Sequence, residues 1–86
     1  MDSFTLSRDA IRAATSWGYL RCHTLIEKPY RLGSRYDLSG HKGGGRTERF
    51  RLSDVLSRLR RHKRFKPEME QHLIAADAAY RKGLQS

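Results

Sequence analysis

A run of three glycines, Gly43-Gly44-Gly45, lies at the middle of this 86-residue chain. Glycine has no side chain to pack and loses more conformational freedom on ordering than any other residue, so such a run is a poor continuation of a strand or a helix. On both sides of the run, apolar side chains alternate with charged ones, which is typical of a half-buried strand. The apolar residues of this pattern are Tyr36, Leu38, Phe50 and Leu52. The sequence therefore predicts an antiparallel hairpin over about residues 30–52, with these four side chains inward and the glycines at its tip.

Two helices are expected before the hairpin, over about residues 5–27. Thr5 or Ser7 can cap the first, because a hydroxyl oxygen accepts a hydrogen bond from a backbone N–H at a helix start. The break at Thr15-Ser16 offers a second cap for a helix from about Trp17 to Ile26. In that helix Trp17, Leu20, Thr24 and Leu25 recur at helical spacing, and Trp17 is expected in the core. Two short helices joined by a tight turn suggest a helix-turn-helix unit.

Two further helices are expected after the hairpin. Ser53-Asp54 should cap a helix over about residues 53–64, and Pro67 should begin a C-terminal helix over about residues 67–82, because proline favours the first helical position. The apolar stripe of the last helix is expected to pack in the core rather than to form a dimer seam. This stripe consists of Met69, Leu73, Ala76 and Tyr80. The chain is thus predicted to be one α+β domain, residues 1–86, with three or four helices and a two-stranded hairpin.

Positive charge is concentrated in one block of the chain, whose net charge is +9 overall. Residues 28–66 hold 13 Lys and Arg side chains against three acidic ones, a net charge of +10, and the rest holds five basic and six acidic residues. Charge that served solubility alone would be expected to spread along the chain. Clustered cations bind phosphates, so the distribution predicts a surface for a nucleic acid.

Other classes of protein have little support in the sequence. Cys22 is the one cysteine, which fits a reducing compartment. No apolar run is long enough to span a membrane, and Met1–Phe4 lacks the features of a signal peptide, so the cytoplasm is expected, with association with the nucleoid on DNA. Cys22 and His23 are neighbours and point to different faces of a helix, so no enzyme is predicted. We expect no cofactor, metal or small-molecule ligand.

Candidate contacts with nucleic acid lie on the second helix and on the hairpin. On the helix they are Ser16, Tyr19, Arg21 and His23, placed where a recognition helix presents side chains to base edges or phosphates. On the hairpin they are Arg31, Arg35, His41, Lys42, Arg46 and Arg49, which would reach phosphates or the minor groove. The alternative for Tyr19 and His23 is partial burial against the hairpin. The alternative for the hairpin cations is a solvated strand face.

The order helix, turn, helix, basic hairpin and helix, with Arg49-Phe50-Arg51 followed by Asp54-Val55, resembles a known group. It is similar to the winged helix-turn-helix domains of the MerR-like and phage-excisionase group, which often carry an Arg-aromatic-Arg-x-x-Asp-Val run where the wing enters the next helix. The resemblance covers about residues 5–62. It implies that residues 16–23 form the recognition helix and residues 31–51 the wing. This wing is longer than usual in that group, and a long dimerisation helix and an effector domain are not expected.

The resemblance implies a small protein that binds double-stranded DNA. Its expected role is that of a transcriptional regulator, or of an excisionase-like architectural factor of a phage, plasmid or other mobile element. A homodimer or a cooperative assembly on repeated half-sites is expected, because one small surface rarely suffices. Two other classes stay open. One is an RNA- or ribosome-associated basic module; the other is an inhibitor or antitoxin whose charge meets an acidic protein.

Overall fold

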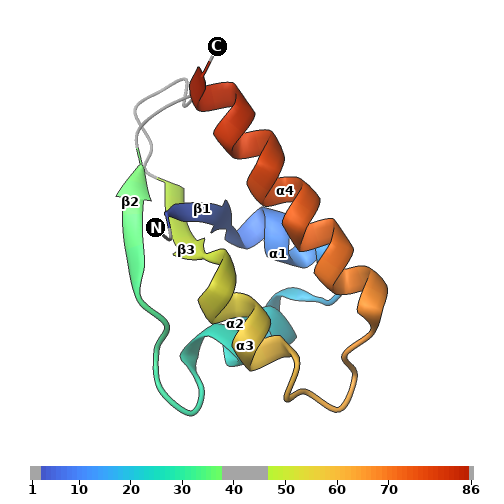
Figure 1. Cartoon of the computed structure of the whole chain (residues 1–86). Coiled ribbons are helices and arrows are strands. Elements are labelled where there is room, and N and C mark those ends of the chain that lie inside the picture. The colour runs from blue at the N-terminus through green and yellow to red at the C-terminus, as the bar shows by residue number, and fades with distance from the viewer. Residues whose placement is uncertain (1–2, 38–46, 86) are drawn as a thin grey trace.

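The computed structural model describes residues 3–37 and 47–85 as a small α+β fold (Figure 1). Its elements, in chain order, are β1 (Phe4–Ser7), α1 (Arg8–Thr15), α2 (Tyr19–Glu27), β2 (Ser34–Asp37), β3 (Thr47–Arg51), α3 (Leu52–Leu59) and α4 (Pro67–Gln85). In the described part, the strands form one antiparallel sheet in the order β1-β3-β2. The α+β prediction is therefore confirmed, with one strand more than the sequence predicted.

The additional strand, β1, occupies the segment in which the first helix was expected to begin. Its residue Leu6 is fully buried and pairs with Phe50 of β3. The first helix begins after it, at Arg8, and Ser7 is its N-cap: the Ser7 Oγ accepts a hydrogen bond from the Ala10 N–H at 3.1 Å. Ser7 is thus the cap, and Thr5 belongs to the sheet.

The turn between α1 and α2 differs from the expected one. Ser16 has a left-handed backbone (φ 61°) and ends α1, its N–H donating to the Arg12 carbonyl at 2.7 Å. The N-cap of α2 is Gly18, so the prediction that Thr15-Ser16 starts the second helix is wrong. The hydroxyl of Thr15 accepts the N–H of Trp17, and the Trp17 side chain enters the core as expected. Trp17 thus enters the core from the turn between α1 and α2.

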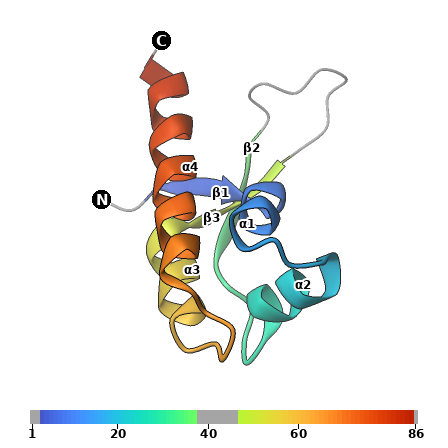
Figure 2. The same cartoon turned by 90° about the vertical axis from the view of Figure 1, so that its right-hand side faces the viewer.

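The prediction of two antiparallel strands is confirmed, whereas the prediction of which side chains face inward is only partly right. β2 and β3 pair antiparallel, with Ser34 opposite Phe50 and Tyr36 opposite Glu48. Phe50 is fully buried, but Tyr36 is 58% exposed and Leu52 already belongs to α3. Tyr36 pairs with Glu48, two residues before the buried Phe50, and β2 and β3 continue past α1 and α2 in this direction (Figure 2). Leu38 and the glycine run lie outside the described residues.

The boundaries of the last two helices are also corrected. The N-cap of α3 is Arg51, without a side-chain cap, and Ser53 and Asp54 lie inside its first turn. α3 ends at Leu59 rather than near residue 64, because Leu59 is its last buried residue and the chain must turn to bring Phe65 against the core. α4 begins at Pro67 as predicted and continues beyond residue 82.

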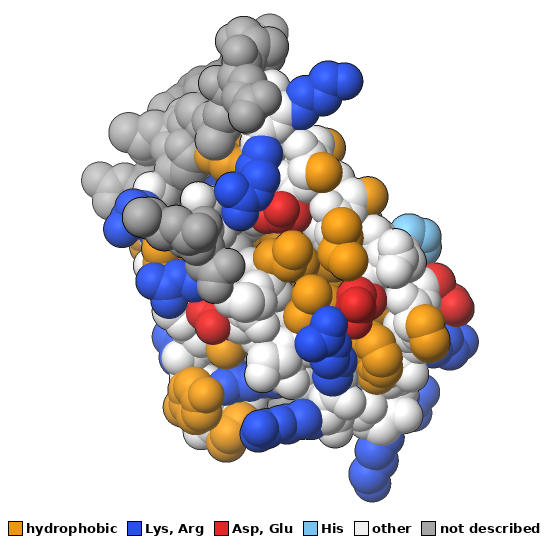
Figure 3. Space-filling view, viewed as in Figure 1, with side chains coloured by type: hydrophobic (Ala, Val, Ile, Leu, Met, Phe, Trp, Pro, Cys, Tyr) orange, Lys and Arg blue, Asp and Glu red, His pale blue; other side chains and the backbone are white. Residues whose placement is uncertain are grey.

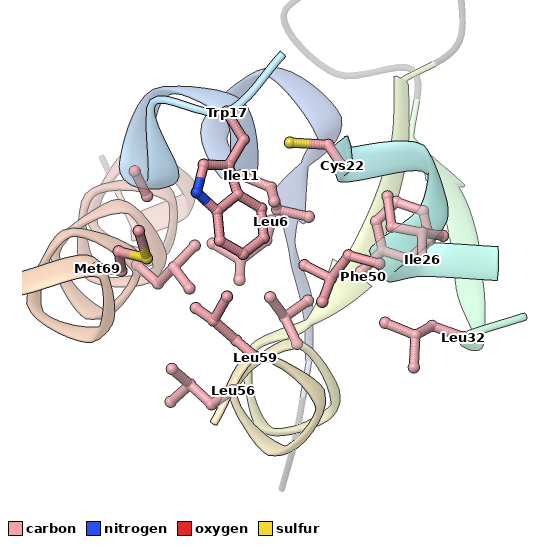
Figure 4. Close-up of a cluster of buried hydrophobic side chains, with 14 residues drawn as sticks. Leu6, Ile11, Trp17, Cys22, Ile26, Leu32, Phe50, Leu56, Leu59 and Met69 are labelled. Carbon is pink, nitrogen blue, oxygen red and sulfur yellow. The ribbon is translucent and has the colours of Figure 1, made fainter. Parts of the chain in front are cut away.

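The core lies between the sheet and the helices (Figure 4). It includes Leu6, Ile11, Ile26, Phe50, Val55 and Leu59, and α4 adds Met69 and Leu73. Burying each large apolar side chain contributes roughly 1.5–3 kcal/mol. The expectation that the stripe of α4 packs in the core is confirmed for Met69, Leu73 and, partly, Ala76.

A polar network also joins α4 to the sheet. The hydroxyl of Thr5 donates to the buried carboxylate of Asp77, whose second oxygen accepts from the Arg81 Nε at 2.9 Å. The guanidinium of Arg49 lies 4.0 Å from the centre of the Tyr80 ring and donates to the Thr5 carbonyl at 3.0 Å. A buried carboxylate is tolerated when it is paired and hydrogen-bonded. These contacts hold α4 against β1 and β3.

Candidate nucleic-acid interface

Helix α2 lies on the side of the molecule opposite α4 (Figure 2). It buries Cys22, Leu25 and Ile26 and leaves the rest of its circumference at the surface. Leu20 and Thr24 therefore face outward, although the spacing in the sequence grouped them with Trp17 and Leu25. Trp17 lies before the first residue of α2, Tyr19, and is not part of this helix. The spacing between Trp17 and Leu20 therefore does not show which face of α2 is buried. The outer face of α2 is uncovered among the described residues.

Three surfaces run along the exposed part of α2. On one flank, the rings of Tyr19 and His23 stack with centres 5.8 Å apart and planes 18° from parallel. Tyr19 is 56% exposed, whereas His23 is half-buried. Leu20 and Thr24 form the middle. On the other flank lies Arg21, with its guanidinium 5.8 Å from the Trp17 ring.

An open groove of about 490 Å³ separates α2 from the end of α3. Leu20 and Leu25 are apolar residues of its lining, and Arg21, Lys28 and Arg61 are exposed cations of its rim. In residues 3–37 and 47–85, none of these three cations forms an ion pair. Figure 3 shows Lys and Arg side chains along the lower edge of the molecule, near the ends of α2 and α3. Arg21 lies on α2, Lys28 is its C-cap, and Arg61 follows the end of α3, so the groove gathers three cations that no described carboxylate neutralises.

Other cations of the basic block have structural partners. The Nη1 of Arg58 donates to the carbonyls of Leu25 and Ile26 at 3.1 Å and of Tyr30 at 2.6 Å. It thereby satisfies carbonyls that the end of α2 leaves without helical partners. The Nη2 of Arg60 lies 2.9 Å from the Glu70 carboxylate. Arg58 and Arg60 therefore hold elements together and account for part of the charge at the end of α3.

Arg31 belongs to an ion-pair cluster centred on Glu48. The Glu48 carboxylate, only 10% exposed, accepts hydrogen bonds from Arg31 Nη2 at 2.6 Å, Ser34 Oγ at 2.7 Å and Arg8 Nη2 at 3.1 Å. Arg31 also pairs with Glu27 at 3.1 Å. The cluster joins α1, the end of α2, β2 and β3, and so fixes α2 relative to the hairpin.

This cluster should make stability depend on pH. Burial alone would raise the pKa of Glu48, but hydrogen bonds from Ser34, Arg31 and Arg8 outweigh it and hold this pKa below its ordinary value. Because the folded pKa is lowered, the contribution is present above the unfolded pKa of about 4.3 and is lost as pH falls through the folded pKa. At pH 7 we expect Glu48→Gln to lower the free energy of unfolding by about 1.5–3 kcal/mol, as for hydrogen bonds to charged groups.

Urea unfolding at pH 7, 5 and 3 measures this difference, which should shrink at pH 3. The matched control is Glu68→Gln, which removes an exposed carboxylate that forms no ion pair in the described part of the chain. Equal effects of the two substitutions at every pH would contradict the role of Glu48.

The remaining predicted contacts on the hairpin are not gathered with those of α2. Arg35 and Arg49 lie opposite each other in the register, on the sheet face that alternates with Phe50. The Arg35 guanidinium lies 4.9 Å from the Phe4 ring, where Arg51 lies at 4.4 Å. Arg35 is exposed, whereas Arg49 is half-buried against Tyr80. His41, Lys42 and Arg46 lie outside the described residues.

The sequence pattern thus indicated Tyr19, Arg21 and His23 on α2, but not four residues that lie beside them. The missed residues are Leu20, Thr24, Lys28 and Arg61. The charges of Lys28 and Arg61 were counted in the basic block, but no local signal brings two residues 33 positions apart into one groove. Ser16 is exposed in the turn before α2 rather than on that helix.

Comparison with protein-family models, with curated proteins and with solved structures gives no match for this chain. In the two described segments, no group of three or more His, Cys, Asp or Glu side chains is placed to hold a metal ion. A helix long and apolar enough to cross a membrane is likewise absent from these segments.

Proposed function

We propose that this chain is a winged helix-turn-helix protein that binds double-stranded DNA. In this proposal α2 enters the major groove and the β2–β3 hairpin lies against the adjacent backbone or minor groove. The observation that carries the proposal is the groove beside α2, where Arg21, Lys28 and Arg61 converge and form no ion pair with any described residue. Sugar–phosphate backbones flank the major groove, so cations beside an inserted helix meet phosphates.

The arrangement of the elements adds support. α1 and α2 are consecutive helices joined by a three-residue turn, Ser16–Gly18, and α2 presents its N-terminal residues Tyr19, Leu20 and Arg21 to solvent. In helix-turn-helix proteins the first residues of the second helix contact base edges, and the major groove is wide enough to admit a helix. The antiparallel hairpin that follows corresponds in order to the wing of the MerR-like and excisionase-like domains that the sequence resembles.

The biological role that follows is transcriptional regulation or an architectural role in DNA recombination of a mobile element. One copy presents one short helix, so binding as a homodimer on two half-sites is part of the proposal. Half-sites would then be separated by about one helical turn, roughly 10 base pairs, or a multiple of it.

Selection from a random duplex library, followed by competition, tests the proposal. We expect enrichment of a repeated motif, displacement by unlabelled duplex of that sequence, and little displacement by a structured RNA of equal length and charge. Arg21→Ala should weaken binding, whereas Lys82→Ala, an exposed cation on α4, should change it little. Displacement by RNA but not by duplex DNA would instead assign an RNA-binding module.

A further inference from the structure

The middle of the outer surface of α2 is apolar, although both of its flanks are polar. Leu20 is 77% exposed, and Thr24 lies one helical turn later on the same side of α2. These two side chains form an outward-facing ridge. The Thr24 Oγ1 donates to the Leu20 carbonyl at 2.9 Å, so its hydrogen is committed to the helix backbone. The γ-methyl is then the apolar group that Thr24 adds to the ridge. Outward-facing positions of a surface helix ordinarily carry polar side chains.

The flanks of this ridge limit what it can contact. Arg21 and the cationic groove lie on one side, and the Tyr19–His23 stack lies on the other. A partner that meets the ridge must therefore present small apolar groups beside negative charge. The major groove of DNA has this combination, because the C5-methyl of thymine lies on the groove floor between two phosphate backbones.

We propose that Leu20 and the Thr24 methyl contact thymine C5-methyl groups, so that α2 selects its target partly through apolar contacts with thymine. This inference rests on the proposed insertion of α2 into the major groove. Arg21 would then hold the phosphate backbone and fix the depth of insertion. Leu20 would discriminate thymine from cytosine at one position, and Thr24 at a different one.

Replacing each thymine of the selected site in turn by deoxyuridine tests the inference, because the exchange removes only the methyl. We expect the dissociation constant of the unaltered protein to rise about fourfold at each contacted thymine, the effect of one buried methyl-sized group. Leu20→Ala should weaken binding to the thymine site by a similar or larger factor. At the thymine that Leu20 contacts, that variant should no longer distinguish thymine from uracil, which is the non-additivity expected of groups in contact.

The matched variant is Thr24→Ser, which keeps the hydroxyl and removes the methyl. In this variant, replacing the thymine that Thr24 contacts by deoxyuridine should no longer change the dissociation constant. The same replacement at the thymine that Leu20 contacts should weaken binding as much as it does for the unaltered protein. Leu20 is largely exposed, and alanine is a good helix former, so thermal unfolding of the Leu20→Ala protein should match that of the parent.

Two results would overturn the inference while leaving the proposed function in place. One is tight duplex binding in which uracil equals thymine at every position. The other is a Leu20→Ala variant that loses affinity but still distinguishes thymine from uracil as the parent does. Absence of any duplex binding would overturn both, and capture of an acidic protein by the same ridge would then explain the exposed leucine.

Discussion

Replacing Arg21, Lys28 and Arg61 together by alanine should weaken binding to duplex DNA on the order of 100-fold at low salt. All three cations line the groove between α2 and α3, and none forms an ion pair in the described part of the chain. Each phosphate contact releases about 0.9 of a counterion, so the slope of log K against log salt concentration should fall in magnitude by about 2.7. Titrations at several salt concentrations measure both quantities.

The matched control removes the same charge elsewhere. Lys63, Lys66 and Lys82 are exposed, lie outside the groove and form no ion pair in the described segments. Replacing these three by alanine should change the slope by less than about one unit, because they are not expected to contact phosphates. Equal losses in the two triple variants would mean that net charge, rather than the groove, governs binding. Circular dichroism of both variants checks that the fold is kept.

The second large effect is expected at Leu73, on the buried face of α4. Its side chain is fully buried in the core, so Leu73→Ala should lower the free energy of unfolding by about 2–5 kcal/mol through lost burial and the remaining cavity. A domain of this size has a net stability of only about 5–15 kcal/mol. We therefore expect a large fall in the denaturation midpoint in urea.

Ile74 provides the control, because it is the adjacent residue of the same helix and is 39% exposed. Ile74→Ala should cost less, about 1–1.5 kcal/mol, since part of its side chain remains in water when folded. The large effect of Leu73→Ala should not depend on protein concentration, because its contacts lie within one chain. Similar costs for the two substitutions, or a strong concentration dependence, would contradict the packing of α4 in the core.

Much of the local structure could be predicted from the sequence because its signals are local. Ser7 caps α1, Pro67 begins α4, and the alternation around Phe50 forms a strand in the structure. Each signal depends on hydrogen bonds or backbone angles within a few residues. The strand β1 escaped prediction because four residues carry little pattern, and its pairing with β3 joins Phe4 to Arg51.

The candidate site was less predictable than the fold. The position of a cation within the basic block does not show whether it forms an ion pair with a carboxylate. Arg31 binds Glu48 and Glu27, and Arg60 binds Glu70, whereas Arg21 forms no ion pair in the described residues. These partners come from elements that meet only after folding. A charge count therefore predicts that phosphates attract the chain, but it does not show which side chains are available to them.

The sequence by itself determined the secondary-structure types of the helices and the hairpin, the burial of Trp17 and Phe50, and the excess of positive charge. Only the tertiary structure decided that Leu20 faces solvent and that Arg21, Lys28 and Arg61 share one groove. The physical reason is the range of the interactions. Helix caps and alternation act over a few residues, whereas the exposed face of α2 depends on which elements, distant in sequence, cover its other sides.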